Sequence, residues 1–292
     1  MTVPAAIISD VAVDLHAHST ASDGSADPEE LVALALAKGL VALALTDHDT
    51  QEGIPAATEA AARGGLELIP GTELSLDYDS GGMHLIVLWL NPGTGPLQDQ
   101  LGALQGGRSG RNIGIVDRLT ALEMPMTIEE VLEEAGEGTV GRPHIAAVMV
   151  AKGYVPDIKT AFDEWLGNNK PAYLGRPRLD PEKAIRLARE SGAVPILAHP
   201  HTLGINRAAK MADLLDSLVG WGLVGLEAIY PSYHRHERDG YTDLARRFGL
   251  VPSGGSDYHG SYKPGLDLGT GYGDLVVPIS ILDELRKHSA GE

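Results

Sequence analysis

The sequence predicts an α/β protein built on a barrel-like sheet, with a small helical insertion in the middle of the chain. Two observations support this fold class. Short apolar runs alternate with amphipathic helical segments in the first and last parts of the chain, which is typical of parallel β-α units. Between them, residues 99–172 carry only helical patterns. We therefore expect a barrel formed by residues 1–98 and 173–292, with an insertion over 99–172 that covers the substrate.

Apolar runs bounded by turn residues predict the strands. The run LVALALT is apolar throughout, as expected for a strand that is buried on both faces of a parallel sheet. The predicted strands span residues 11–16, 40–46, 66–75, 83–90, 193–200 and 224–230, and the segment LVPSGGSDYHG follows at 250–260. Because most of these runs are separated by helical segments, the sequence favours parallel pairing.

Helical segments are recognised by their caps and their periodicity. Asp27 provides an N-cap and Pro28 the first helical position of a helix that carries two glutamates in its first turn. In the insertion, Thr127 and Glu130 have the spacing of a capping box. The other predicted barrel helices span residues 53–63, 181–191, 207–221 and 235–248.

Composition excludes several functions. The chain has 292 residues, a net charge of −17 and no cysteine, so it has no disulfide, thiolate metal site or cysteine nucleophile. The negative charge argues against stable binding of duplex DNA, which depends on lysine and arginine neutralising phosphates. No signal peptide is recognisable, and no apolar run reaches the roughly 20 residues that span a membrane. We expect a cytoplasmic protein without a membrane partner, and the sequence predicts no oligomeric state.

Histidines and acids gather at the ends of the predicted strands. They are Asp14, His16, His18 and Asp23; Asp47, His48 and Asp49; Glu73; His84, near the start of its strand; His199; and Asp257 with His259. In a parallel α/β barrel the carboxyl ends of the strands meet at one mouth, where catalytic residues lie. Imidazole and carboxylate together suit manganese, iron or zinc better than magnesium. The pattern therefore predicts a centre of divalent metal ions.

Each part of this pattern also has an ordinary interpretation. His16 and His18 share one face of a strand and can chelate one ion, but an isolated pair of this kind is often a surface feature. His84 alone would be a core histidine bonded to the backbone. Asp257 alone would be a turn residue in a glycine-rich loop. The recurrence of such residues at the ends of several strands favours metal binding over these readings.

The motifs resemble those of the PHP (polymerase and histidinol phosphatase) family. DLHAHSTASDG, ALTDHDT, PGTELS, MHLIVLW, LAHP and GGSDYHG occur in the family's order. They are most similar to the phosphoesterase branch that includes 3',5'-nucleotide bisphosphate phosphatases and the exoribonuclease called RNase AM. The resemblance covers nearly the whole chain. It implies a distorted (β/α)7 barrel with three divalent ions bound in each chain.

The resemblance also implies which residues bind each ion. The first ion would be held by His16, His18, Glu73 and Asp257; the second by Glu73, His84 and His199; the third by Asp23, His48 and His259. A metal-bound hydroxide held by Glu73, His199 and Asp257 is the expected nucleophile. Asp47, Asp49 and Glu227 are then candidates for orienting the imidazoles, or in the case of the two aspartates for capping the next helix.

Basic residues in and after the insertion are candidates for binding the substrate. By the same resemblance, Arg142, His144 and Lys170 contact a substrate phosphate. Arg176 and Arg178 lie just beyond. Arginine binds phosphate with a planar fork, whereas lysine acts as a point charge. The alternative is that these residues form solvated surface pairs.

The sequence therefore predicts a metal-dependent phosphoesterase that acts on a 3',5'-bisphosphate nucleotide or a short 5'-phosphorylated RNA. A second reading keeps the metals and changes the substrate to a small phosphate monoester such as histidinol phosphate. A third is a non-catalytic PHP module that binds metal without turnover.

Overall fold

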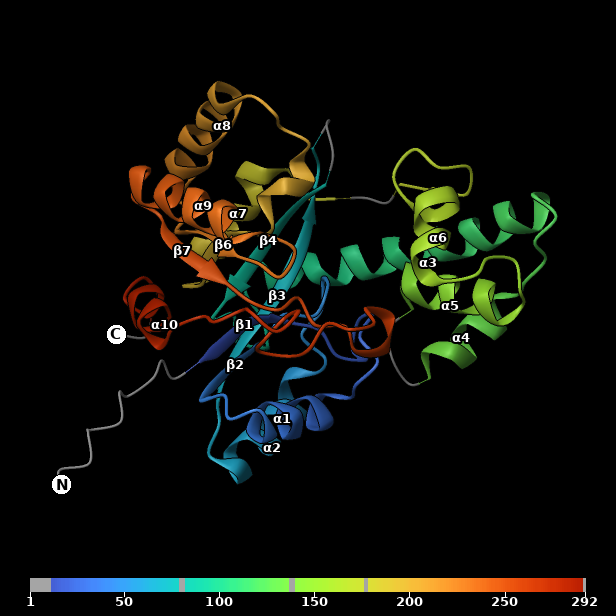
Figure 1. Cartoon of the computed structure of the whole chain (residues 1–292), viewed down its shortest axis with the longest axis horizontal. Coiled ribbons are helices and arrows are strands. Elements are labelled where there is room, and N and C mark those ends of the chain that lie inside the picture. Colours follow the sequence, from blue (N-terminus) through green and yellow to red (C-terminus); the bar gives the residue numbers. More distant parts are fainter. Residues whose placement is uncertain (1–11, 79–81, 137–139, 176–177, 291–292) are drawn as a thin grey trace.

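A curled sheet of seven strands forms the centre of the protein (Figure 1). The computed structural model describes residues 12–78, 82–136, 140–175 and 178–290. The strands are β1 Val13–Ala17, β2 Ala42–Leu45, β3 Glu67–Leu76, β4 Met83–Leu88, β5 Val194–Leu197, β6 Gly225–Ile229 and β7 Val251–Gly254. They pair in the order of the sequence, from β1 to β7. The predicted barrel-like α/β fold is thereby confirmed.

Helices cover the outside of the sheet and make up the insertion. They are α1 Pro28–Ala37, α2 Ile54–Gly64, α3 Gln98–Ala121, α4 Ile128–Ala135, α5 Arg142–Ala151, α6 Ile158–Ala161, α7 Pro181–Glu190, α8 Ala208–Trp221, α9 Arg235–Arg247 and α10 Ile279–Arg286. Three short turns complete them: η1 Phe162–Leu166, η2 Pro200–Leu203 and η3 Gly260–Tyr262. The predicted capping boxes, Asp27 with Glu30 and Thr127 with Glu130, are confirmed. Every helix in the described part of the chain is too short or too polar to cross a lipid bilayer.

One strand runs against the predicted direction. β1, β2 and β3 are parallel to one another, as are β5, β6 and β7, but β4 is antiparallel to both of its neighbours. No helix separates β3 from β4, so the chain turns back directly and the pair must be antiparallel. The start of β4 therefore lies beside the end of β3, and Ser75 pairs with His84.

Backbone hydrogen bonds join the two edges of the sheet at the mouth of the barrel. The Asp257 N–H donates to the His16 carbonyl at 2.8 Å, and the His18 N–H donates to the Tyr258 carbonyl at 3.0 Å. The segment after β7 is thus held against the end of β1. This pairing places the HAH and DYH motifs next to each other.

The insertion has a hydrophobic core of its own. The first turns of α3 pack against the barrel through Leu101 and Leu104. Its later turns pack with α4, α5 and α6 around Ile115, Ile145 and Leu166. Figure 1 shows these helices beside the barrel. The division into 1–98, 99–172 and 173–292 stays a prediction.

Gly255 lies where β1 and the segment after β7 touch. A Cβ atom there would lie 2.5 Å from the Cβ and the backbone nitrogen of His16 and 2.9 Å from Oδ1 of Asp14. We expect Gly255→Ala to lower the free energy of unfolding by about 1–3 kcal/mol, because the inserted methyl group forces these atoms apart. Thermal and urea unfolding of the metal-free protein measure this change.

Gly240→Ala is a suitable control. Gly240 is exposed within α9, and a Cβ atom there meets nothing within 4 Å. This variant should gain up to about 1 kcal/mol from the better helix propensity of alanine. Equal stability of the two variants would contradict the close packing at Gly255.

Candidate metal centre

The nine side chains predicted as metal ligands lie together. Their ligand atoms form four overlapping groups, in each of which all atoms lie within 4.8 Å of one another. The groups are His18, Asp23, His48 and His259; His16, His199 and Asp257; His16, His18 and Glu73; and His48, Glu73 and His84. Because several side chains belong to two groups, the nine residues form one continuous cluster.

Glu73 occupies the middle of this cluster. Its Oε1 lies 2.9 Å from Nδ1 of His84 and 2.9 Å from Nε2 of His199. Its Oε2 lies 3.4 Å from Nε2 of both His16 and His18. The two oxygens of one carboxylate therefore face two different pairs of imidazoles, and Oε2 also faces the imidazole of His48. A carboxylate in this position can bridge two cations.

His48 reaches Glu73 because β2 continues into the loop that follows it. Beyond the end of β2, His48 forms an isolated parallel bridge with Glu73. The Asp49 N–H donates to the Glu73 carbonyl at 3.1 Å, and the Glu73 N–H donates to the Asp47 carbonyl at 3.3 Å. This pairing brings Nδ1 of His48 to 3.0 Å from Oε2 of Glu73. Backbone pairing between the TDHDT motif and β3 thus places His48 beside Glu73.

Asp257 also lies close to His16 and His18. Its Oδ1 lies 3.6 Å from Nε2 of His16 and 3.4 Å from Nε2 of His18. Its Oδ2 accepts hydrogen bonds from the Tyr230 hydroxyl at 2.7 Å and from Nζ of Lys263 at 2.5 Å. Tyr230 and Lys263 were not predicted. Tyr230 directly follows β6, so its position at a strand end was the only indication in the sequence.

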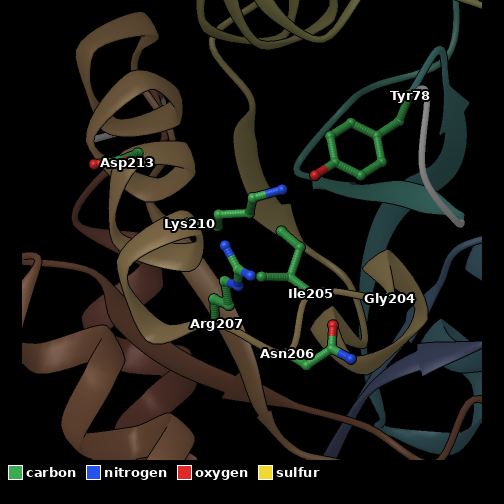
Figure 2. A pocket seen from close by; sticks show the side chains of 7 residues that line it. All are labelled: Tyr78, Gly204, Ile205, Asn206, Arg207, Lys210 and Asp213. Carbon is green, nitrogen blue, oxygen red and sulfur yellow. The ribbon is translucent and has the colours of Figure 1, made fainter.

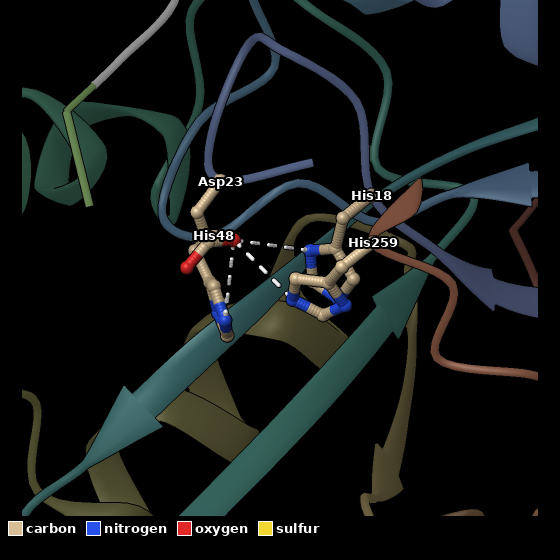
Figure 3. Close-up of side chains that lie close together, drawn as sticks. All are labelled: His18, Asp23, His48 and His259. Carbon is tan, nitrogen blue, oxygen red and sulfur yellow. Dashed lines mark ion pairs between the residues drawn. The ribbon is translucent and has the colours of Figure 1, made fainter. Parts of the chain in front are cut away.

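Asp23 lies at the centre of the third group of side chains (Figure 3). Its Oδ1 lies 3.4 Å from Nε2 of His259, 3.8 Å from Nε2 of His48 and 4.0 Å from Nδ1 of His18. Figure 3 shows the three imidazoles around this one carboxylate. His18 faces this group with Nδ1 and the Glu73 group with Nε2, so it connects the two.

The residues fit a metal centre in their chemistry. Nε2 of His16 and Nε2 of His18 lie 3.1 Å apart, facing each other between two carboxylates. Nδ1 of His18 is buried and has no hydrogen-bond partner among the described residues. Buried polar atoms are normally paired, and neutral imidazole nitrogens beside carboxylate oxygens are the ligands that divalent transition metals prefer. A cation would satisfy these atoms.

The two central acids remain ionised despite their burial. Burial alone would raise the pKa of the Glu73 carboxyl, but the imidazoles of His48 and His84 hold that pKa well below its ordinary value. Burial would likewise raise the pKa of Asp257, and Lys263 and His16 hold it well below its ordinary value. Both side chains therefore present negative charge to a cation.

Glu227 supports two of the imidazole-bearing residues. Its Oε1 lies 2.9 Å from Nδ1 of His16, and its Oε2 accepts a hydrogen bond from the His199 N–H at 2.7 Å. His199 has a φ of 23°, which is strained for a residue with a Cβ atom. The Glu227 carboxylate thus orients the ring of His16 and holds the backbone of His199. Its position at the end of a strand indicated such a supporting role in the sequence.

Asp47 hydrogen-bonds to the loop that follows β1 and also interacts electrostatically with the imidazole of His18. Its carboxylate accepts hydrogen bonds from the Ser19 N–H at 2.8 Å and from the hydroxyls of Ser19 and Ser22 at 2.6 Å each. These bonds fix the loop that carries Asp23. The neighbouring Asp49 accepts from the Ser75 N–H at 3.4 Å, so it contacts β3. Asp49 also interacts electrostatically with His84, and the N-cap of α2 is Gly53, so neither aspartate occupies the N-cap of that helix.

An arginine-lined cleft adjoins the cluster. Arg111, Arg142 and Arg178 line it together with Asp23, His48, Ser75 and His84. A second cleft of about 320 Å³ begins at Asp23, His48 and His259 and is lined by Pro143, Ile158, Phe162 and Tyr262 from the insertion and from η3. Of the two clefts beside the cluster, one is therefore lined by cationic side chains and the other mainly by apolar and aromatic side chains.

The predicted substrate-binding residues lie in different surroundings. The Arg142 side chain donates to the Leu166 carbonyl at 3.1 Å and lies over the rings of Phe162 and Tyr173. His144 is buried and accepts from the Gly141 N–H at 2.9 Å. Lys170 is exposed and is not among the residues that line either cleft. Arg176 lies outside the described residues, and substrate contact by these residues stays a prediction.

Comparison with known proteins agrees with this arrangement. Residues 14–100 match the family model of the PHP domain. A 5'-3' exoribonuclease of Haemophilus influenzae is 34% identical over 247 residues, which cover 84% of this chain and 89% of the relative. The chain belongs to the PHP family. The resemblance stated from the motifs is confirmed.

Other PHP proteins align over similar lengths. A 3',5'-nucleoside bisphosphate phosphatase of Chromobacterium violaceum is 30% identical over 258 residues, covering 88% of this chain and 90% of the relative. A structure described as a metal-dependent phosphoesterase from Bifidobacterium adolescentis is 29% identical, with a TM-score of 0.85 over 95% of this chain and 96% of that chain. Like these relatives, this PHP protein is a metal-dependent phosphoesterase.

The bonds of Asp47 predict a role in metal retention by this PHP protein. Asp47→Asn keeps the size of the side chain but weakens its bonds to Ser19 and Ser22, so Asp23 is less firmly held. We expect metal affinity at the Asp23 group to fall about 10–100-fold, as for other residues that support a ligand. Metal retained after dialysis against a chelator measures this. Asp239→Asn, on the exposed face of α9, is the control, and equal retention by both variants would contradict the role.

Proposed function

We propose that this phosphoesterase hydrolyses the phosphate ester on the 3' side of a 5'-phosphorylated ribonucleotide. The substrate is a 3',5'-bisphosphate nucleotide or a short 5'-phosphorylated oligoribonucleotide. The observation that carries the proposal is the position of three arginines, Arg111, Arg142 and Arg178, in one cleft with His48 and His84 of the cluster. The names of the Haemophilus and Chromobacterium relatives support the same class of substrate.

Three divalent ions, of manganese, iron or zinc, fit the proposed ligand groups. His16, His18, Glu73 and Asp257 would hold the first ion; Glu73, His84 and His199 the second; and Asp23, His48 and His259 the third. When bound, such ions lower the pKa of coordinated water and neutralise charge on phosphoryl oxygens. Glu73, His199 and Asp257 would surround the attacking water.

The two clefts beside the cluster bind the rest of the nucleotide. The arginines offer planar forks that match the oxygens of the 5'-phosphate, at a distance from the ester that is cleaved. The cleft lined by Pro143, Phe162 and Tyr262 has apolar and aromatic surfaces suited to a nucleoside. His144 caps the helix that carries Arg142 through the bond from Gly141, so it positions the arginine. Lys170 contributes a further positive charge near the exit of the insertion.

Hydrolysis of a small panel of substrates tests the proposal directly, measured as inorganic phosphate released from the monoesters and as 5'-mononucleotide released from the oligoribonucleotide. The panel contains adenosine 3',5'-bisphosphate, a 5'-phosphorylated tetraribonucleotide, adenosine 3'-monophosphate and histidinol phosphate, each with added manganese, iron or zinc. We expect the first two to have the highest kcat/KM. A preference for histidinol phosphate would overturn the assignment of a nucleotide substrate.

Glu73→Gln should abolish most activity. The substitution keeps the shape of the side chain but removes the negative charge that faces both pairs of imidazoles. We expect kcat to fall at least about 10²–10³-fold, the range seen when one preorganised electrostatic group is lost. Glu67→Gln is the control, because Glu67 lies at the exposed start of the same strand. Undiminished activity of Glu73→Gln would rule out a bridging role.

Arg142→Ala should act mainly on KM. The guanidinium group is proposed to bind the 5'-phosphate, which does not change during the reaction. We expect KM for adenosine 3',5'-bisphosphate to rise about tenfold or more, since a charged hydrogen bond contributes about 1.5–3 kcal/mol. With adenosine 3'-monophosphate, which lacks the 5'-phosphate, the variant and the wild type should have similar KM. A similar rise with both substrates would contradict the contact.

A further inference from the structure

A third, larger cleft lies between Tyr78 and the start of α8. It has a volume of about 820 Å³. Tyr78, just beyond the end of β3, forms one side, and the segment that leads from η2 into α8 forms the other (Figure 2). On that second side the lining side chains are Ile205, Asn206, Arg207, Lys210 and Asp213. None of these residues belongs to the metal cluster or to the arginine-lined cleft.

Two exposed cations line this cleft. Arg207 and Lys210 are exposed, and neither forms an ion pair with another described residue. Figure 2 shows Lys210 and Tyr78 extending toward each other, whereas Asp213 points away from Tyr78. The chain as a whole has a net charge of −17, so most of its surface repels polyanions. Among the charged residues that line this cleft, Arg207 and Lys210 outnumber Asp213.

The start of α8 adds to the positive character. Arg207 is the N-cap residue of this 14-residue helix, and no side chain caps the first turn. The first N–H groups of the helix are therefore not satisfied by a cap and carry partial positive charge. Together with the two side chains, they form a site suited to phosphate oxygens.

The cleft lies close to the metal cluster along the chain, and hydrogen bonds fix the segments between them. The Gly82 N–H donates to the Thr202 carbonyl at 2.8 Å, and the Thr202 hydroxyl donates to the Gly82 carbonyl at 2.7 Å. Nδ1 of His199 lies 3.2 Å from the same hydroxyl. Tyr78 follows Glu73 by five residues, so the chain separates them by at most about 18 Å. A strand of a few nucleotides is long enough to cover this distance.

We propose that this cleft binds the sugar-phosphate backbone of an oligoribonucleotide on the 3' side of the bond that is cleaved. Arg207 and Lys210 contact its phosphates, the Asn206 amide hydrogen-bonds to it, and the Tyr78 ring stacks against a base. This inference rests on the proposed function and deepens it. It assigns the protein a preference for oligonucleotides over mononucleotides.

Binding in the absence of metal tests the cleft independently of catalysis. The probe is a 5'-hydroxyl octaribonucleotide with a 3' fluorescein, measured by fluorescence anisotropy in EDTA. We expect the double variant Arg207→Ser, Lys210→Ser to bind it about tenfold more weakly than the wild type. The slope of log affinity against log salt should decrease by about 1.4, or about 0.7 for each lost phosphate contact on a single strand.

A second double variant controls for the change in net charge. Arg247→Ser, Lys287→Ser removes two exposed cations at the ends of α9 and α10, away from the cleft. It should bind the octaribonucleotide like the wild type. Equal Kd values for all three proteins, or equal weakening in both variants, would overturn the proposed site.

Activity measurements separate this inference from the proposed function. In the Arg207→Ser, Lys210→Ser variant, kcat/KM for a 5'-phosphorylated tetraribonucleotide should fall about tenfold, while that for adenosine 3',5'-bisphosphate should not change. A parallel fall for both substrates would contradict the site. If the wild type hydrolyses neither substrate, the proposed function is rejected, and the comparison of Kd values still decides for or against the cleft.

Discussion

The charge of one buried carboxylate determines how the mouth of this barrel is built. Glu73 is 1% exposed, and an ionised carboxylate in the interior is costly unless other charged or polar groups surround it. Those groups come from several strands: His16 from β1, His84 from β4 and, directly after β5, His199. Stabilising the charge of Glu73 therefore brings residues that are distant in the sequence together around one side chain. The same arrangement leaves nitrogen and oxygen atoms in the positions that a cation requires.

Much of the cluster could be predicted because its ligands occur in short motifs. His16 and His18 are two residues apart on a strand, and Asp257 and His259 have the same spacing. On an extended strand, such spacing directs both side chains to the same face. Strand ends could be placed from apolar runs, and parallel strands end at a common mouth. These rules depend only on local patterns, which a single sequence contains.

Other features depend on contacts that local patterns do not encode. The apolar composition of β4 does not indicate in which direction the strand runs. It is antiparallel to its neighbours because it connects directly to β3. That reversal explains why His84, at the start of its strand, joins residues at the ends of others. Lys263 and Arg111 are single residues in polar segments, so nothing in their neighbourhood indicated that they reach the site. Asp47 binds serines 25 and 28 residues earlier, a pairing that only the folded loop creates.

The separate hydrophobic core of the insertion affects how proteins of this kind can diverge. Helices α4 to α6 pack mainly on one another and on the end of α3, so substitutions there do not disturb the packing beneath the strands. The insertion residues that line the two clefts beside the cluster, such as Arg142 and Phe162, can therefore change during evolution while the ligand groups at the strand ends are preserved.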